Sequence, residues 1–227
     1  MENLSLLEKK LNIKFKNKNL LKQAFVHRSY LNEHPDFPLG QNERLEFLGD
    51  AVLELVTTKF LYNNFNNPEG ELTSFRSSLV NTKNLAKTAK QLKINRYLYL
   101  SKGESKSNGR AREVILANTF EALVGAIYLD QGLVQVEKFI HQHLLPYLEV
   151  VLKNKLYKDP KSKFQEIVQE KLKITPTYKI IQESGPDHAK KFKVGVFLKE
   201  KMIALGIGKN KQEAELKAAE KALYKNF

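Results

Sequence analysis

The chain has 227 residues, of which 38 are Lys or Arg and 25 are Asp or Glu, and its formal net charge is +13. Its 42% hydrophobic content supports a folded core and excludes a disordered chain, while the lack of cysteine excludes disulfides, iron–sulfur clusters and thiolate zinc sites. The isoelectric point near 9.6 favours a polyanionic partner, either nucleic acid or an anionic membrane surface, over a basic surface that binds nothing.

The first two thirds of the sequence predict helices alone. Apolar residues recur at helical spacing over residues 6–11, 20–25, 42–62, 72–79, 85–92, 111–129 and 134–152, the last as one continuous helix. A loop is expected from Asn32 to Gly40, where Pro35 and Pro38 interrupt the pattern. The polar stretch from Ser101 to Gly109 is expected to be flexible, and no strand is expected before residue 150.

The pattern changes after Lys153, where residues 154–158 have the composition of a short linker. Beyond it the sequence predicts a helix, three strands and a final helix, over residues 161–172, 178–183, 191–199, 203–207 and 214–223. This order predicts a C-terminal α+β (α-β-β-β-α) domain, 159–227, with two helices on one face of an antiparallel sheet. It follows a mainly α domain, 1–153. Residues 154–227 hold 17 Lys and 9 acidic residues, so the smaller domain is the more densely basic.

The N-terminal sequence MENLSLLEKKLNI lacks the apolar core of a signal peptide. No apolar run approaches the roughly 18 residues that are needed to span a bilayer. We therefore expect a soluble, cytoplasmic protein without a membrane partner and without a small-molecule cofactor.

Three acidic residues stand at helical spacing near residue 45. Glu43, Glu46 and Asp50 occupy positions i, i+3 and i+7, which share one face of a helix. Leu45, Leu48, Val52 and Leu55 are expected to form the neighbouring apolar stripe. Because three carboxylates on one face repel each other, a cation that neutralises them is expected.

A second helix carries Asn118 and Glu121 at i, i+3 inside an apolar run. If the two helices pack antiparallel, Glu46, Asp50, Asn118 and Glu121 come together. Oxygen ligands without cysteine fit Mg²⁺ or Mn²⁺ rather than zinc, and such a metal supports phosphodiester hydrolysis.

The ordinary explanation of such acids is the solvated face of an amphipathic helix. Gly49 argues against it, because a glycine inside a helix costs on the order of 1 kcal/mol relative to alanine. Close packing of another element or close approach of a ligand is a reason to keep glycine there.

The chain resembles the ribonuclease III family over nearly its whole length. NERLEFLGDA at 42–51 resembles the family signature, and ANTFEALVGAIYLD at 117–130 resembles its second acidic motif. The C-terminal region, with KFQEIVQEK, TPTY, GPDHAKKF and GKNKQEAELKAAEKAL, resembles a double-stranded-RNA-binding domain. The resemblance implies a helical endonuclease fold, a homodimer, and cleavage of RNA duplexes to 5′-phosphate and 3′-hydroxyl ends in the processing of ribosomal and other structured precursor RNAs.

The resemblance also implies roles for individual residues. Asp50 and Glu121 correspond to the catalytic pair, and Glu46, Asp50, Asn118 and Glu121 to the metal ligands, with Mg²⁺ as the expected ion and Mn²⁺ as a substitute. Glu43 corresponds to a supporting acid. Many family members have Asp where this chain has Asn118, so the site has one negative charge fewer, and metal affinity or preference is expected to change.

Duplex RNA is recognised mostly by its shape, through 2′-hydroxyls and phosphates. In the small domain, Gln165 and Gln169 are expected to present amides to one minor groove, and His188 to reach a second. The complete set expected to contact RNA is Gln165, Glu166, Gln169, His188, Lys190, Lys191, Lys209 and Lys211. Each of these residues alone is more often ordinary surface, and only their joint placement in the α-β-β-β-α pattern favours RNA binding.

Two other functions compete with the nuclease. A protein that kept the fold but only binds RNA is supported by Asn118 alone, and the intact Glu46, Asp50 and Glu121 argue against it. A generic helical DNA-binding protein lacks a helix-turn-helix or zinc module in this sequence. For the homodimer, the helix that contains the signature and the segment Phe37 to Leu39 are the candidate interface. For His27, which with Arg28, Ser29 and Tyr30 also matches a family pattern, a structural role at a helix end is expected.

Overall fold

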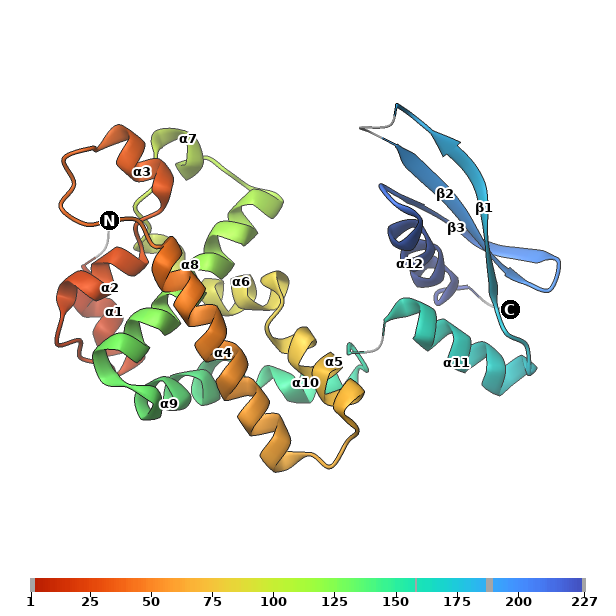
Figure 1. Ribbon diagram of the computed structural model, residues 1–227, viewed down its shortest axis with the longest axis horizontal. Helices are drawn as coiled ribbons and strands as arrows, with labels where there is room; N and C mark the ends of the chain where they lie inside the picture. Colours follow the sequence, from red (N-terminus) through yellow and green to blue (C-terminus); the bar gives the residue numbers. More distant parts are fainter. Residues whose placement is uncertain (1–2, 158, 187–189, 226–227) are drawn as a thin grey trace. The chain divides into compact units, whose positions relative to one another are not determined.

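The computed structural model describes residues 3–157, 159–186 and 190–225, which form two compact units, Met1–Tyr157 and Lys158–Phe227 (Figure 1). The first unit is helical, and the second is a three-stranded sheet with two helices. The mainly α and α+β fold classes predicted from the sequence are confirmed. No helix in the described ranges has both the length and the apolar character required to cross a membrane.

Most helices of the first unit follow the predicted segments, whereas the helices at 28–33 and 94–96 lie where none was predicted. The helices are α1 (Leu4–Leu11), α2 (Lys18–Ala24), α3 (Arg28–Glu33), α4 (Glu43–Asn64), α5 (Glu69–Leu79), α6 (Thr82–Gln91), the 3₁₀ helix η1 (Ile94–Arg96), α7 (Lys102–Ser105), α8 (Gly109–Gln131), α9 (Leu133–His143) and α10 (Tyr147–Lys153).

Two details of the prediction were wrong, and a third segment contains a short helix that was not predicted. The segment 134–152 forms two helices, α9 and α10, because Pro146 cannot donate the next helical hydrogen bond and disfavours helical backbone before it. The loop expected from Asn32 begins later, since α3 continues to Glu33. The polar stretch after Ser101 contains α7, whose first turn is capped by the Ser101 hydroxyl accepting from the Glu104 amide.

The side chain of His27 caps α3 by accepting from the backbone amide of Ser29 at 3.3 Å, so it stands at a helix end.

Helices α4 and α8 form the centre of the first unit, where α4 (orange) runs across α8 (green) in Figure 1. Most of α8 from Ile115 to Ile127 is buried, because its apolar residues surround the helix instead of lining one face. A helix that is apolar on all sides belongs in a core. It is therefore a fixed element against which α4 and α6 pack.

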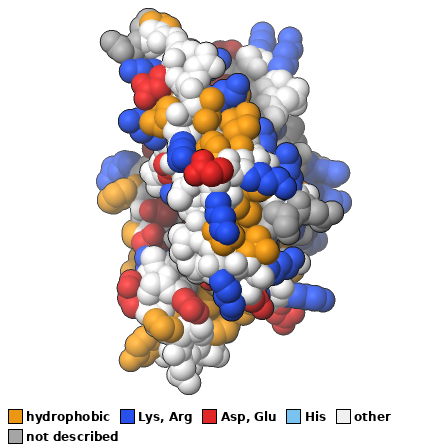
Figure 2. Space-filling view, turned by 90° about the vertical axis from the view of Figure 1, so that its right-hand side faces the viewer, with side chains coloured by type: hydrophobic (Ala, Val, Ile, Leu, Met, Phe, Trp, Pro, Cys, Tyr) orange, Lys and Arg blue, Asp and Glu red, His pale blue; other side chains and the backbone are white. Residues whose placement is uncertain are grey.

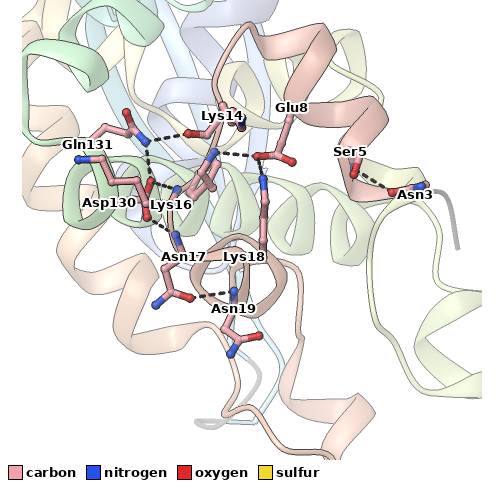
Figure 3. A network of polar contacts seen from close by, with 11 residues as sticks. Asn3, Ser5, Glu8, Lys14, Lys16, Asn17, Lys18, Asn19, Asp130 and Gln131 are labelled. Atoms are coloured by element: carbon pink, nitrogen blue, oxygen red, sulfur yellow. Dashed lines mark hydrogen bonds and ion pairs between the residues drawn. The ribbon is translucent and has the colours of Figure 1, made fainter.

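A polar network ties the end of α8 to the N-terminal segment (Figure 3). The Asp130 carboxylate accepts hydrogen bonds from the backbone amides of Lys16 at 2.8 Å and Asn17 at 2.7 Å, and from the Gln131 amide at 2.6 Å. Nearby, the buried Glu8 carboxylate accepts from the Phe15 amide and pairs with the Lys18 ammonium. These bonds fix the start of α2 beside the end of α8.

The N-terminus of α4 is fixed by α2 in turn. The buried Asn42 side chain donates to the Ala24 carbonyl oxygen at 3.1 Å, and the Asn42 backbone amide donates to the Val26 carbonyl oxygen at 2.9 Å. The end of α8 and the beginning of α4 are thus connected through α2.

The second unit has helices α11 (Pro160–Leu172) and α12 (Lys211–Ala222) and strands β1 (Thr177–Ser184), β2 (Lys191–Leu198) and β3 (Lys201–Gly208). The sheet is antiparallel in the order β1-β2-β3. Its core joins Phe164 and Val168 of α11 to Val196 of β2 and to Ala218 and Ala219 of α12.

Close packing of α12 on the sheet depends on glycine in β3. A Cβ atom on Gly206 would lie 2.0 Å from the Ala214 carbonyl oxygen, so a larger residue there would push α12 away.

We predict that Asp130→Ala lowers the free energy of unfolding by about 1–2 kcal/mol at pH 7, because two backbone amides lose a charged acceptor at a partly exposed site. Burial alone would raise the pKa of Asp130, but hydrogen bonds from Asn17, Lys16 and Gln131 outweigh it and hold the pKa below its ordinary value. A carboxylate whose pKa is lower in the folded than in the unfolded protein stabilises the fold at pH values above its unfolded-state pKa. This stabilisation is lost as the pH falls through the folded-state pKa.

Urea unfolding at pH 7 and at pH values down to about 3 measures this contribution. The deficit of Asp130→Ala relative to the wild type should shrink as the pH falls, whereas Asp36→Ala, at an exposed position, should match the wild type throughout. An equal deficit at every pH would contradict the role given to the carboxylate.

Candidate functional site

Two glycines let α4 and α8 touch through their backbones. A Cβ atom on Gly49 would lie 1.8 Å from the carbonyl oxygen of Glu121, and a Cβ atom on Gly125 would lie 2.3 Å from the carbonyl oxygen of Leu45. Side chains larger than hydrogen therefore cannot occupy either position without moving a helix. This contact brings polar residues of the two helices close to one another.

Four predicted site residues meet at this contact, Glu46 and Asp50 from α4 and Asn118 and Glu121 from α8. The Asn118 side-chain amide donates a hydrogen bond to the Glu46 carboxylate. Burial raises the pKa of Glu46 above its ordinary value, the Asn118 hydrogen bond opposes that rise, and the charges of Glu43 and Asp50 add to it. The two helices are therefore joined by a polar contact as well as by backbone packing.

Glu121 experiences the strongest electrostatic effect in this cluster. Burial, followed by the negative charges of Asp50 and then Glu46, raises the pKa of Glu121 to about 8. No Lys or Arg is among the groups that shift the pKa of Glu46 or Glu121. The charges of Asp50 and Glu46 therefore act on Glu121 in the same direction as its burial.

Glu43, the predicted supporting acid, stands at the start of α4 and is exposed. Its carboxylate accepts from the Gln41 amide at 2.9 Å and lies 3.8 Å from the Arg28 guanidinium. It acts on the cluster through its charge, which reaches Glu46.

The donor set fits a hard divalent cation. Among residues 3–157, 159–186 and 190–225, no three His, Cys, Asp or Glu side chains are grouped so that they could hold a metal ion by themselves. Mg²⁺ does not require such a group, because it commonly takes one or two carboxylates and completes its shell with water and substrate phosphate oxygens. Carboxylate and amide oxygens with unrelieved negative charge are ligands of this kind.

The predicted RNA-contact residues of the second unit lie in two places. Gln165, Glu166 and Gln169 are exposed on α11, and the Gln169 amide donates to the Thr175 hydroxyl at 3.3 Å. Lys191 begins β2, and its neighbour Phe192 pairs with Gly208, so Lys209 lies at the same end of the sheet.

The same end of the sheet carries Lys190 and Lys211, whose ammonium groups lie 3.4 and 4.0 Å from Glu183. Figure 2, which faces the second unit, shows Lys and Arg side chains distributed among hydrophobic ones. His188 lies outside the described residues.

Two structural residues of the site were not predicted from the sequence. Gly125 is the counterpart of Gly49 across the helix contact, and Asn42 fixes the start of α4 to α2. The position of Gly125, four residues after Glu121 in an otherwise apolar helix, is the signal that points to it. Asn42 has the appearance of an ordinary helix cap and carries no comparable signal.

Comparison with known proteins identifies both units. A family model described as ribonuclease-III-like matches residues 17–148, and a double-stranded RNA binding motif matches residues 160–225. Proteins named Ribonuclease 3 from Oceanobacillus iheyensis and from Streptococcus thermophilus are each 46% identical over 218 residues, covering 96% of this chain and 95% of theirs. The chain belongs to the ribonuclease III family.

The solved nuclease domain of ribonuclease III from Campylobacter jejuni is 36% identical, with a TM-score of 0.58, and covers 63% of this chain and 97% of that domain. That domain has a region involved in dimer formation. The ribonuclease-III-like match contains Glu46, Asp50, Asn118 and Glu121.

We predict that Glu121→Gln raises the thermal midpoint of unfolding in metal-free buffer at pH 7, because burial and the charges of Asp50 and Glu46 raise the pKa of Glu121 to about 8, so that folding requires this carboxylate to take up a proton. Added Mg²⁺ should stabilise the wild type more than Glu121→Gln, since the wild type gains more from a neutralising cation. Differential scanning calorimetry measures both effects, with Glu220→Gln at an exposed position of α12 as the control. A midpoint of Glu121→Gln equal to or below that of the wild type would count against the repulsive cluster.

Proposed function

We propose that this ribonuclease III family member is an endoribonuclease that hydrolyses phosphodiester bonds in double-stranded RNA and leaves 5′-phosphate and 3′-hydroxyl ends. It acts in the cytoplasm on ribosomal and other structured precursor RNAs and needs no small-molecule cofactor. The observation that carries the proposal is the gathering of Glu46, Asp50, Asn118 and Glu121 where α4 and α8 touch, within a chain that matches the family along both units.

Asp50 and Glu121 are the proposed catalytic carboxylates, and Glu46, Asp50, Asn118 and Glu121 the proposed ligands of Mg²⁺, with Mn²⁺ as a substitute. When bound, the ion supplies an activated water and stabilises the charge that develops on the phosphate. The chain itself orients the ligands, since Asn118 restrains the Glu46 carboxylate and the Gly49 contact places Glu121 near Asp50. Glu43 supports the site by adding negative charge beside Glu46.

A protein that binds duplex RNA without cutting it is the alternative, and Asn118 is the residue on which it rests. An amide oxygen ligates Mg²⁺ but brings no charge, and the Asn118 amide nitrogen donates to Glu46 in a way that an aspartate could not. Asn118 is therefore compatible with a cluster that cleaves RNA as well as with one that does not.

We predict that the wild type cuts a long labelled RNA duplex with Mg²⁺ or Mn²⁺, and that Glu121→Ala binds the duplex but cuts it at least a hundredfold more slowly. Asn118→Asp should lower the Mg²⁺ concentration needed for half-maximal cleavage, because it adds a charged ligand. A wild type that binds without cutting, together with cleavage restored by Asn118→Asp, would establish the binding-only alternative.

For the domains, we propose a catalytic domain over 1–153, a linker over 154–158 and a double-stranded-RNA-binding domain over 159–227. In the last, Gln165, Glu166 and Gln169 contact one minor groove and His188 a second. The phosphates between the two minor grooves are contacted by the lysines at one end of the sheet, Lys190, Lys191, Lys209 and Lys211. The exposure of the α11 residues and the shared location of these lysines support this interface.

We predict that replacing both Lys191 and Lys209 with Gln reduces the slope of log Kd against log salt concentration by about 2, because each phosphate contact contributes close to one counterion. Titration of a duplex of about 20 base pairs between about 50 and 200 mM salt measures it. The matched control replaces Lys199 and Lys201, which lie at the opposite end of the sheet, where Leu198 pairs with Lys201. An equal reduction of the slope in both variants would show that only the net charge of the protein determines the salt dependence of binding.

We also propose that the protein is a homodimer joined through α4. Phe47, Leu55 and Tyr62 of this helix are 82%, 55% and 78% exposed, so Leu55 is the member of the predicted apolar stripe that lies at the surface. Leu55 points outward because the adjacent Leu53 and Val56 take the buried positions. Exposed large apolar side chains on one helix are typical of a surface that a partner covers.

A hollow of about 660 Å³ lies beside Phe47, lined in part by Leu20, Leu48 and Leu129, and it supports the same interface. In a symmetric pair each Phe47 would face the partner's surface. Phe37, the other candidate, packs against Tyr30 and Tyr99 of its own unit and is less available.

We predict a dimer for the wild type in sedimentation at micromolar concentration and a monomer for Phe47→Lys, because a charge would be buried without a partner. Tyr224→Lys, at an aromatic position 87% exposed in the second unit, should remain dimeric. A monomeric wild type would refute the proposed assembly.

A further inference from the structure

An acidic residue, Glu183, stands at the basic end of the sheet in the second unit. It lies near the end of β1 and pairs with Phe192 of β2, which pairs in turn with Gly208 of β3. The lysines for which phosphate contact is proposed gather at this same end. A carboxylate there lowers the positive charge that a polyanion meets, so the charge of Glu183 by itself works against RNA affinity.

The Glu183 carboxylate joins two lysines that belong to different elements. Its Oε2 atom lies 3.4 Å from the Lys190 ammonium nitrogen, and its Oε1 atom lies 4.0 Å from the Lys211 ammonium nitrogen. Lys190 comes directly before β2, whereas Lys211 is the first residue of α12. Because each oxygen faces a different ammonium group, the carboxylate bridges the two lysines and offsets the repulsion between them.

Lys211 is restrained by its surroundings as well. Its ammonium nitrogen lies 5.9 Å from the centroid of the Phe192 ring, within the distance at which an aromatic ring attracts a cation. The start of α12 is fixed by a capping box, in which the Asn210 side chain accepts from the Glu213 amide and the Glu213 carboxylate accepts from the Lys209 amide, both at 2.8 Å. The backbone that carries Lys211 is therefore held in place.

Lysines with a fixed separation discriminate between duplexes in a way that mobile lysines do not. A-form RNA and B-form DNA differ in the widths of their grooves, so the phosphates on the two sides of a groove are spaced differently. A mobile lysine follows the phosphates of either duplex and contributes to non-specific binding. Two lysines held at one separation contact fully only the backbone whose phosphates match it, and they pay less entropy when they do so.

We propose that Glu183 is a positioning residue that makes the second unit prefer duplex RNA to duplex DNA. It holds Lys190 and Lys211 at the separation that the phosphates of A-form RNA require, and its negative charge weakens the contacts that a mismatched backbone would make. The inference rests on the phosphate contacts proposed above for these two lysines. Since both ion pairs are partly exposed, they add little to stability, and their effect falls on binding.

Fluorescence anisotropy of the full chain tests the proposal, with labelled RNA and DNA duplexes of the same sequence and about 20 base pairs, in EDTA so that neither is cut. The measured quantity is the Kd for DNA divided by the Kd for RNA. We expect Glu183→Gln to lower this ratio at least threefold, mainly through tighter binding of DNA. Glu200→Gln removes the same charge from the exposed turn between β2 and β3 and should leave the ratio unchanged.

The same substitution in a chain that has Gln at both Lys190 and Lys211 should not change the ratio, because no lysines remain to be positioned. Thermal melting verifies that each variant is folded. The proposal is overturned if Glu183→Gln changes the affinity for both duplexes by the same factor, or if its effect on the ratio persists without the two lysines. If replacing the two lysines leaves RNA affinity and its salt dependence unchanged, the proposed RNA interface itself is wrong, and the inference falls with it.

Discussion

The contact between the backbones of α4 and α8 is the constraint on which the rest of the first unit depends. Cβ atoms on Gly49 and Gly125 would collide with the carbonyl oxygens of Glu121 and Leu45, so the two helices contact each other through their backbones. Because Asp50 follows Gly49 and Glu121 lies one helical turn before Gly125, this approach brings the two acidic motifs together. The polar bonds of Asp130 and Asn42 connect the same two helices through α2.

The proximity of these carboxylates has an electrostatic cost. Burial and the charges of Asp50 and Glu46 raise the pKa of Glu121 to about 8, and burial raises that of Glu46, partly opposed by the Asn118 amide. A fold that only needed stability would place apolar residues here. In the proposed chemistry, a divalent cation that binds together with the phosphate of an RNA duplex relieves this repulsion.

Much of this arrangement could be predicted from sequence, and the exceptions have physical causes. Glu46, Asp50, Asn118 and Glu121 were predicted to come together if the two helices pack antiparallel, and Gly49 was predicted to mark either close packing or close approach of a ligand. Gly125 was missed, although its position four residues after Glu121 places it on the same face of α8 as that residue. The exposure of Leu55 was not predicted, because periodicity does not distinguish a face that packs in the core from one that a partner can cover.

The stability and cleavage activity of Gly49→Ala, compared with Gly70→Ala, test the central claim most directly. A methyl group on Gly49 would meet the Glu121 carbonyl oxygen, whereas one on Gly70 would meet nothing within 4 Å. The account predicts that Gly49→Ala loses about 1–3 kcal/mol of unfolding free energy and at least tenfold in cleavage rate, while Gly70→Ala stays within about 0.5 kcal/mol of the wild type. Wild-type stability and cleavage in Gly49→Ala would contradict the claim that this helix contact builds the site.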